Sequence, residues 1–288
     1  MGGGSYNYVS AHSRSVSSSH RSNTEIFRQK SMSDEMSIRG KVRESRDSEE
    51  HPESFPIIIA LDTTGSMGDI PRDLVTKSLP EIMKAIIDAG IPHPQLCFVG
   101  VGDVYCDRYP LQCGQFESSD ELMEKWLKLV YLEGGGGGNG GESYNLAWYF
   151  AARHTSIDSF IKRKKKGVLI TIGDEPCHKI IPKAEIQFFF GDSVENSITS
   201  SELLERVRRE WEPYHIQMGN TQWDYTVIES WKELIGEDHL IALPREDYKL
   251  IPVITAIICK VYGINGAANE AEAPKEVIED KKETKITL

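Results

Sequence analysis

The sequence predicts an α/β protein with a doubly wound, mostly parallel sheet, helices on both faces and one short antiparallel edge strand. Two observations predict it. Short apolar, β-branched runs such as 57–61 and 167–172 are typical of strands buried on both faces of a parallel sheet. Helical patterns with an apolar side separate these runs, and the connections are short. Repeated βα units of this kind imply a parallel sheet wrapped by helices.

The individual elements follow from apolar periodicity. The first strand, 57–61, is followed by a helix at 71–89 that Gly90 ends. A second strand is expected at 95–101, and a looser apolar segment at 109–116 is the candidate edge strand. The remaining expected elements are a helix at 119–130, a helix from Gly141 or Ser143 to Arg153, a strand at 167–172, a helix at 200–212, a strand at 215–218, a helix at 223–234, a strand at 240–243 and a helix at 247–261.

The composition divides the chain into three parts. Residues 1–54 are rich in Ser, Arg and Glu and carry few apolar residues, so we expect a disordered or partner-dependent arm. Residues 55–264 hold the alternating strand and helix patterns and form the domain. Residues 265–288 alternate acids and lysines and are expected to be a solvated, charged tail. A chain of 288 residues has room for one sizeable α/β domain with such tails, or for two small domains.

The charge and the termini exclude several classes of protein. A net charge of −11 with no basic stripe argues against nucleic-acid binding. The basic run 162–166 is interpreted as a solvated helix end. No secretory signal is visible, and Tyr6 occupies the place where myristoylation needs Ser or Thr. The apolar stretch 250–261 is too short to span a bilayer. We therefore expect a cytoplasmic protein without a membrane span.

The five cysteines are odd in number and scattered, which does not fit a disulfide framework. Cys97 and Cys259 lie in apolar surroundings and are expected in the core. A zinc site built from the remaining candidates is an alternative that their spacing does not favour. These candidates are Cys106, Cys113, Cys177 and His178.

Oxygen-bearing side chains follow the first strand at alternate positions. Asp62 ends the apolar run, and Thr64 and Ser66 follow it in a loop that contains Gly65 and Gly68. Ligand sites of open α/β sheets lie at the carboxyl ends of strands, and a carboxylate with two hydroxyls suits Mg²⁺ or Mn²⁺. The alternative is an ordinary loop in which a hydroxyl caps the next helix.

A second strand also ends at an acid. The apolar run 167–172 leads to Asp174, which places this carboxylate beside Asp62 at the same edge of the sheet. The glycine-rich segment 133–143 opens onto a helix N-terminus, where anions are favoured, but it lacks the Gly-Lys-Ser/Thr of a P-loop. The three loops in this order identify a ligand site more specifically than any single loop does.

Over residues 56–262 the chain resembles the von Willebrand factor A (vWA) family, which has a Rossmann-like fold. Its metal-ion-dependent adhesion site (MIDAS) carries an Asp-x-Ser/Thr-x-Ser motif, and Asp62, Thr64 and Ser66 fit it in order. The resemblance implies that Asp174 contacts the metal through water. It also implies a contribution from the glycine-rich loop, where Asn139 and Glu142 match, although the family's Thr is absent.

The motif sequences most resemble those of intracellular vWA domains associated with alpha-kinases, which share Asp-Thr-Thr-Gly-Ser-Met and Pro-Cys-His. No kinase domain follows, so that activity does not carry over. The resemblance implies a Mg²⁺- or Mn²⁺-dependent protein-binding module whose open coordination position accepts an Asp or Glu of a partner. In the family such partners include AAA+ ATPases, and large assemblies are a further expectation.

Residues beside the motifs are expected to rim the metal face. His178 and the loop that begins at Asp103 take this place, while Asp69, Asp103 and Asp107 are interpreted as solvated loop acids.

Two other functions remain open. The sequence around Asp62 also resembles haloacid-dehalogenase-like phosphatases, in which this acid is the nucleophile. The glycine-rich loop, and the absence of a second acid cluster near Asp174 beyond Glu175, favour the vWA interpretation and a protein that is not an enzyme. A structural protein with a decayed metal site is the third possibility.

Overall fold

The computed structural model describes residues 4–133, 140–219, 224–245 and 249–264. Its central sheet has the strand order β10-β9-β6-β2-β3-β4. These strands are β2 (Phe55–Asp62), β3 (Pro94–Val101), β4 (Leu111–Cys113), β6 (Gly167–Gly173), β9 (Trp211–Met218) and β10 (Leu240–Leu243). Neighbouring strands run parallel except β3 and β4, which pair antiparallel. The predicted fold class is confirmed, including its short antiparallel edge strand.

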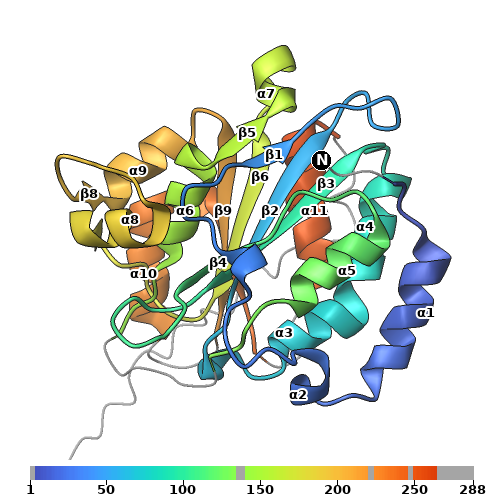
Figure 1. The fold of residues 1–288 in the computed structure, drawn as a ribbon, viewed down its shortest axis with the longest axis horizontal. Coiled ribbons are helices and arrows are strands. Elements are labelled where there is room, and N and C mark those ends of the chain that lie inside the picture. The colour runs from blue at the N-terminus through green and yellow to red at the C-terminus, as the bar shows by residue number, and fades with distance from the viewer. Residues whose placement is uncertain (1–3, 134–139, 220–223, 246–248, 265–288) are drawn as a thin grey trace, which may run out of the picture.

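Helices cover both faces of this sheet (Figure 1). One face packs against α3 (Ile70–Asp73), α4 (Leu79–Asp88), α5 (Asp120–Lys128) and α11 (Leu250–Tyr262). The other packs against α6 (Tyr144–Arg153), α8 (Lys183–Phe190), α9 (Ser200–Val207) and α10 (Asp224–Ile235). The sheet therefore separates two hydrophobic cores.

Strand β2 shows why its sequence is continuously apolar. Side chains alternate along a strand, so Ile57, Ile59 and Leu61 enter one core while Ile58 and Ala60 enter the other. All five are buried. Because neither face meets water, no position between Ile57 and Leu61 favours a polar residue.

The predicted helix at 71–89 is one helical segment with a wider turn inside it. A π-helical turn, η3 (Leu74–Ser78), joins α3 to α4. A π-helical turn widens a helix locally. The segment ends before Gly90, which has a φ of +99° that favours glycine.

The boundary between α9 and β9 differs from the prediction. The expected helix at 200–212 ends at Val207, and the expected strand at 215–218 begins already at Trp211. The Trp211 side chain is fully buried, and a Cβ at Gly167 would lie 2.4 Å from its ring. The missing side chain at Gly167 thus gives Trp211 room in the sheet, a packing effect that helical periodicity does not reveal.

Several short elements are not visible in the sequence pattern. They are the helices α7 (Asp158–Arg163), α8 and η4 (Glu237–His239), and two small sheets that pair β1 (Arg43–Ser45) with β5 (Thr155–Ile157) and β7 (Ile180–Ile181) with β8 (Ile198–Thr199). The basic run 162–166 lies at the end of α7, as interpreted, where Lys162 and Arg163 pair with Asp47.

The segment expected to be an arm packs onto the domain in its described part, residues 4–54. It forms α1 (Tyr8–Ser19), α2 (Asn23–Ile26), the short helix η1 (Asp34–Met36) and β1. Figure 1 shows α1 beside α4 and α5, and Arg14 of α1 pairs with Asp120 and Glu124 of α5. Several apolar residues of this segment enter the existing cores. They are Ile26, Phe27, Met36 and Ile38.

Among the described residues, no helix is long and apolar enough to cross a membrane. The most apolar helix, α11, has 13 residues, which is shorter than a bilayer requires. The start of the helix predicted at 247–261 lies partly outside the described residues, as does the tail predicted at 265–288.

The packing of the N-terminal segment can be tested by substitution. We expect Met36→Ala to lower the free energy of unfolding by about 2–5 kcal/mol, because it removes a side chain with 0% exposure from a core. Val42→Ala is the matched control, since Val42 is 53% exposed and should change stability by less than about 0.5 kcal/mol. Urea unfolding measures both. Equal effects would show that the segment does not dock in solution.

Candidate metal centre

The ends of β2 and β6 bring two predicted acids to the same edge of the sheet. These strands are parallel neighbours, with Leu61 opposite Ile172. Asp62 is the last residue of β2, and Asp174 follows the last residue of β6. Both side chains are buried, with relative exposures of 0% and 6%. Parallel pairing alone therefore places the two carboxylates together, as the sequence predicts.

Asp62 is held by three hydrogen bonds. Its Oδ1 accepts from the backbone N–H of Thr64 at 2.8 Å and from the Thr64 hydroxyl at 2.6 Å. Its Oδ2 accepts from the Tyr144 hydroxyl at 2.8 Å. The bonds from Thr64 fold the loop directly after the strand back onto the carboxylate, so the local sequence builds this part of the site.

The loop hydroxyls connect the two acids. Ser66 lies in the short helix η2 (Gly65–Met67), and its hydroxyl is 3.0 Å from the Thr64 hydroxyl and donates to Asp174 Oδ1 at 3.0 Å. Gly68 ends this helix with a φ of +55°, where a side chain would be strained. Four of the predicted residues thus form one chain of hydrogen-bonded oxygens.

Glu142 reaches the site through backbone pairing. Its N–H donates to the Pro176 carbonyl at 2.9 Å, and its carbonyl accepts from the His178 N–H at 3.1 Å. The side chain is 5% exposed, and its Oε2 has no hydrogen-bond partner among the described residues. The other residue predicted from this loop, Asn139, lies outside the described residues.

The carboxylates are electrostatically unfavourable as buried anions. Burial raises the pKa of Asp62 to about 7, although the hydrogen bonds from Thr64 act in the opposite direction. Burial, and then repulsion by Asp62 and neighbouring acids, raises the pKa of Glu142 to about 10. Both shifts favour the neutral acid, and a bound cation would favour the ionised form instead.

The residues present fit a hard divalent cation. The donors are carboxylate and hydroxyl oxygens, which suit Mg²⁺ or Mn²⁺, and the unpaired Glu142 oxygen is a further one. Within the described residues, no group of three or more His, Cys, Asp or Glu side chains is arranged to hold a metal. The oxygen donors of this candidate site are the hydroxyls of Thr64 and Ser66 together with the carboxylates.

The zinc alternative does not form among the described residues. Cys113 is buried within the sheet, and Cys106 is exposed. The fourth candidate, His178, is committed elsewhere, because its Nε2 lies 2.8 Å from Asp103 Oδ1. As expected, Cys97 and Cys259 are core residues.

The Asp103 loop differs in part from the prediction. His178 contacts this loop, and the Tyr105 ring meets the His178 ring edge-on with centroids 5.0 Å apart. Asp103 is 1% exposed, so its interpretation as a solvated loop acid is wrong. Its carboxylate accepts from the Tyr105 N–H at 3.2 Å, which makes it a residue that shapes the loop.

Sequence reasoning missed Tyr144 and Arg245. Tyr144 begins the helix after the glycine-rich loop and reaches Asp62 only because residue 173 is glycine. A Cβ at Gly173 would lie 1.8 Å from the Tyr144 hydroxyl. Arg245 forms an ion pair with Asp174. A glycine at the end of β6 was the only available signal for the first contact, and nothing in the pattern indicated the second.

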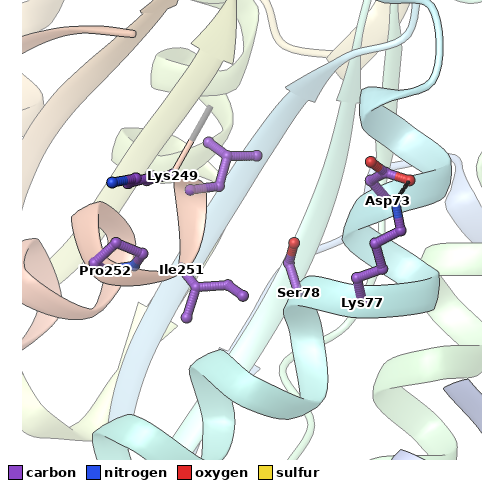
Figure 2. Close-up of a pocket in the computed structure, with 7 residues that line it drawn as sticks. Asp73, Lys77, Ser78, Lys249, Ile251 and Pro252 are labelled. Carbon is purple, nitrogen blue, oxygen red and sulfur yellow. Dashed lines mark ion pairs between the residues drawn. The ribbon is translucent and has the colours of Figure 1, made fainter. Parts of the chain in front are cut away.

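Two hollows lie near the ends of β2 and α11. One, of about 540 Å³, opens beside the metal loop and is lined in part by Thr64, Asp69 and Phe27. The other, of about 460 Å³, lies between η3 and the start of α11, and Figure 2 shows its lining, including the ion pair of Asp73 with Lys77. Only the first contains a predicted site residue.

Solved structures with a similar fold include proteins with vWA domains. The vWF domain of the type V pilus tip protein of Porphyromonas gingivalis is 10% identical, with a TM-score of 0.49, over 74% of this chain and 97% of that domain. Proximal thread matrix protein 1 of the mussel byssus, in a structure with a zinc-occupied MIDAS motif, is 12% identical, with a TM-score of 0.43, over 77% of this chain and 46% of that protein.

A von Willebrand factor type A protein from Catenulispora acidiphila is 16% identical, with a TM-score of 0.38, over 73% of this chain and 43% of that one. The chain thus spans less than half of the mussel and Catenulispora proteins. No protein-family model matches the sequence, and no curated protein matches it. Identities this low concern the fold alone.

The shifted pKa of Glu142 predicts how stability depends on pH without metal. Its pKa is raised in the folded chain, so its contribution is present below about pH 4.5 and is lost as the pH rises toward 10. In EDTA, the free energy of unfolding should therefore fall between pH 7.5 and 9, by at most about 1.4 kcal/mol per pH unit. Urea unfolding at several pH values measures this slope.

Glu142→Gln should flatten the slope because it removes the titrating group. Glu233→Gln, an exposed site on α10, should keep it. A slope that persists in the Glu142 variant would contradict the prediction.

Proposed function

We propose that this chain is a vWA-type module that binds a partner protein through a divalent cation, Mg²⁺ or Mn²⁺. One observation carries the proposal. Asp62, Thr64 and Asp174 are buried, the more exposed Ser66 hydroxyl connects Thr64 to Asp174, and Oε2 of the buried Glu142 lacks a partner among the described residues. Oxygen donors of this kind coordinate a hard cation well. Without a cation, three buried carboxylates would be unfavourable as anions.

The residues divide the work of holding the cation. Asp62 and Asp174 would supply negative charge, the hydroxyls of Thr64 and Ser66 would supply neutral oxygens, and Glu142 would supply a further carboxylate. Asn139 remains a proposed ligand. The bound cation would supply positive charge and a coordination position for an oxygen of the partner. Tyr144 fixes Asp62 by donating to its second oxygen.

The partner is proposed to be a protein that offers an Asp or Glu side chain. A carboxylate matches the charge of the cation, and the 540 Å³ hollow beside Thr64 offers adjoining surface to the residues around that acid. An AAA+ ATPase or a large assembly is the partner class that the resemblance implies. The alpha-kinase-associated wording and the five free cysteines support a cytoplasmic location.

The phosphatase alternative is less well supported. A nucleophilic Asp62 needs an ionised, accessible oxygen, but this side chain is 0% exposed and accepts three hydrogen bonds. Burial also raises its pKa to about 7, which reduces the ionised fraction at neutral pH. These properties favour a ligand held in place over an attacking group. We therefore propose that the protein is not an enzyme.

Metal titration tests the proposal directly. We expect Mg²⁺ or Mn²⁺ to bind the full chain, and Asp62→Ala to weaken binding by at least about a hundredfold, because it removes a charged donor. Asp69→Ala is the matched control from the same loop, since its side chain is 67% exposed and should leave the affinity unchanged. Isothermal titration calorimetry measures all three proteins.

The Asp62→Ala variant also separates the alternatives. Capture of a partner from lysate should require the metal, fail in EDTA and fail with Asp62→Ala but not with Asp88→Ala, a control on α4 whose side chain is 60% exposed. No binding at millimolar metal would leave only a scaffold with a decayed site. A trapped phosphoenzyme on Asp62 would establish the phosphatase instead.

A further inference from the structure

Arg245 reaches the candidate metal centre from a strand that does not border it. It lies two residues beyond β10, and β9 separates β10 from β6 in the sheet. Its guanidinium nevertheless forms an ion pair with Asp174 Oδ2 and donates to the Ser66 carbonyl at 2.7 Å. One long side chain therefore joins the end of β6 to the loop after β2.

This contact neutralises part of the buried charge. Asp62, Asp174 and Glu142 are three buried carboxyl groups at this edge of the sheet. Among the described residues, Arg245 is the basic residue that forms an ion pair with one of them, Asp174. Asp174 is 6% exposed, so a positive charge at its second oxygen meets little competition from water. The other oxygen accepts from Ser66. Both oxygens of Asp174 are thus occupied without a metal.

We propose that Arg245 is the resident counter-ion of this site, and that a divalent cation displaces it from Asp174. The inference rests on the proposed metal-dependent function and states how metal binding at that site would be regulated. Two cations that share one buried carboxylate repel each other, so each lowers the affinity of the other. Arg245 thereby sets how much metal the module needs before it binds a partner.

The exposure of Arg245 makes displacement feasible. Its side chain is 42% exposed, whereas Asp174 is buried, so the guanidinium can move into water while the carboxylate stays in place. The contact also has a use in the metal-free chain. Because Arg245 holds both Asp174 and the backbone of Ser66, it keeps two proposed ligands at the same edge until the metal arrives.

Mg²⁺ titration of variants tests this inference. Arg245→Gln should bind Mg²⁺ about tenfold more tightly than the unsubstituted chain, because the competing charge is gone. Arg209→Gln makes the same change of net charge at an exposed position just before the N-terminal end of β9, away from the candidate metal centre. It should leave the affinity unchanged. Arg245→Lys keeps the charge but loses the two-pronged contact, so an intermediate affinity is expected.

Thermal unfolding gives a second readout that needs no metal. In EDTA, Arg245→Gln should lower the unfolding midpoint, and it should have little further effect once Asp174→Asn has removed the charge that it pairs with. In saturating Mg²⁺ the difference between the unsubstituted chain and Arg245→Gln should shrink.

The outcomes distinguish this inference from the proposed function. Equal or weaker Mg²⁺ binding by Arg245→Gln would overturn the displacement while leaving the metal site intact. Absence of binding by both proteins would overturn the metal-dependent function, and the displacement with it.

Discussion

Mutual repulsion among three carboxyl groups buried at one edge of the sheet is the constraint around which the surrounding structure is arranged. Asp62, Asp174 and Glu142 are each at most 6% exposed, so water does not screen them. Hydrogen bonds from Thr64 and Tyr144, and the ion pair with Arg245, each relieve part of this repulsion. Burial first, and repulsion between the acids second, keeps the pKa values of Asp62 and Glu142 raised, and a bound cation would favour their ionised forms.

The sequence alone predicts the part of the site whose position follows from strand pairing. Parallel strands end at a common edge, so acids directly after two apolar runs must be neighbours, and Asp62 and Asp174 are. The contacts of Tyr144 and Arg245 could not be predicted in this way. They depend on the reach of a long side chain across strands that are distant in sequence, and no local periodicity records that distance.

The N-terminal segment shows a different limit of composition. Few apolar residues in a segment such as 1–54 predict that it does not form a core of its own. Composition does not say whether isolated apolar side chains such as Met36 and Ile38 find places in a core built by other elements. Docking of such a segment is decided by cavities in the folded domain, which only the three-dimensional structure reveals.

The contact between residue 173 and Tyr144 links two positions that are far apart in the chain. A Cβ at position 173 would occupy the place of the Tyr144 hydroxyl, so any larger residue there must push the ring away from Asp62. A smaller residue at position 144 would make room, but it would leave Asp62 without its third hydrogen bond. Across related proteins, Gly at the first position and Tyr at the second should therefore be inherited and lost as a pair.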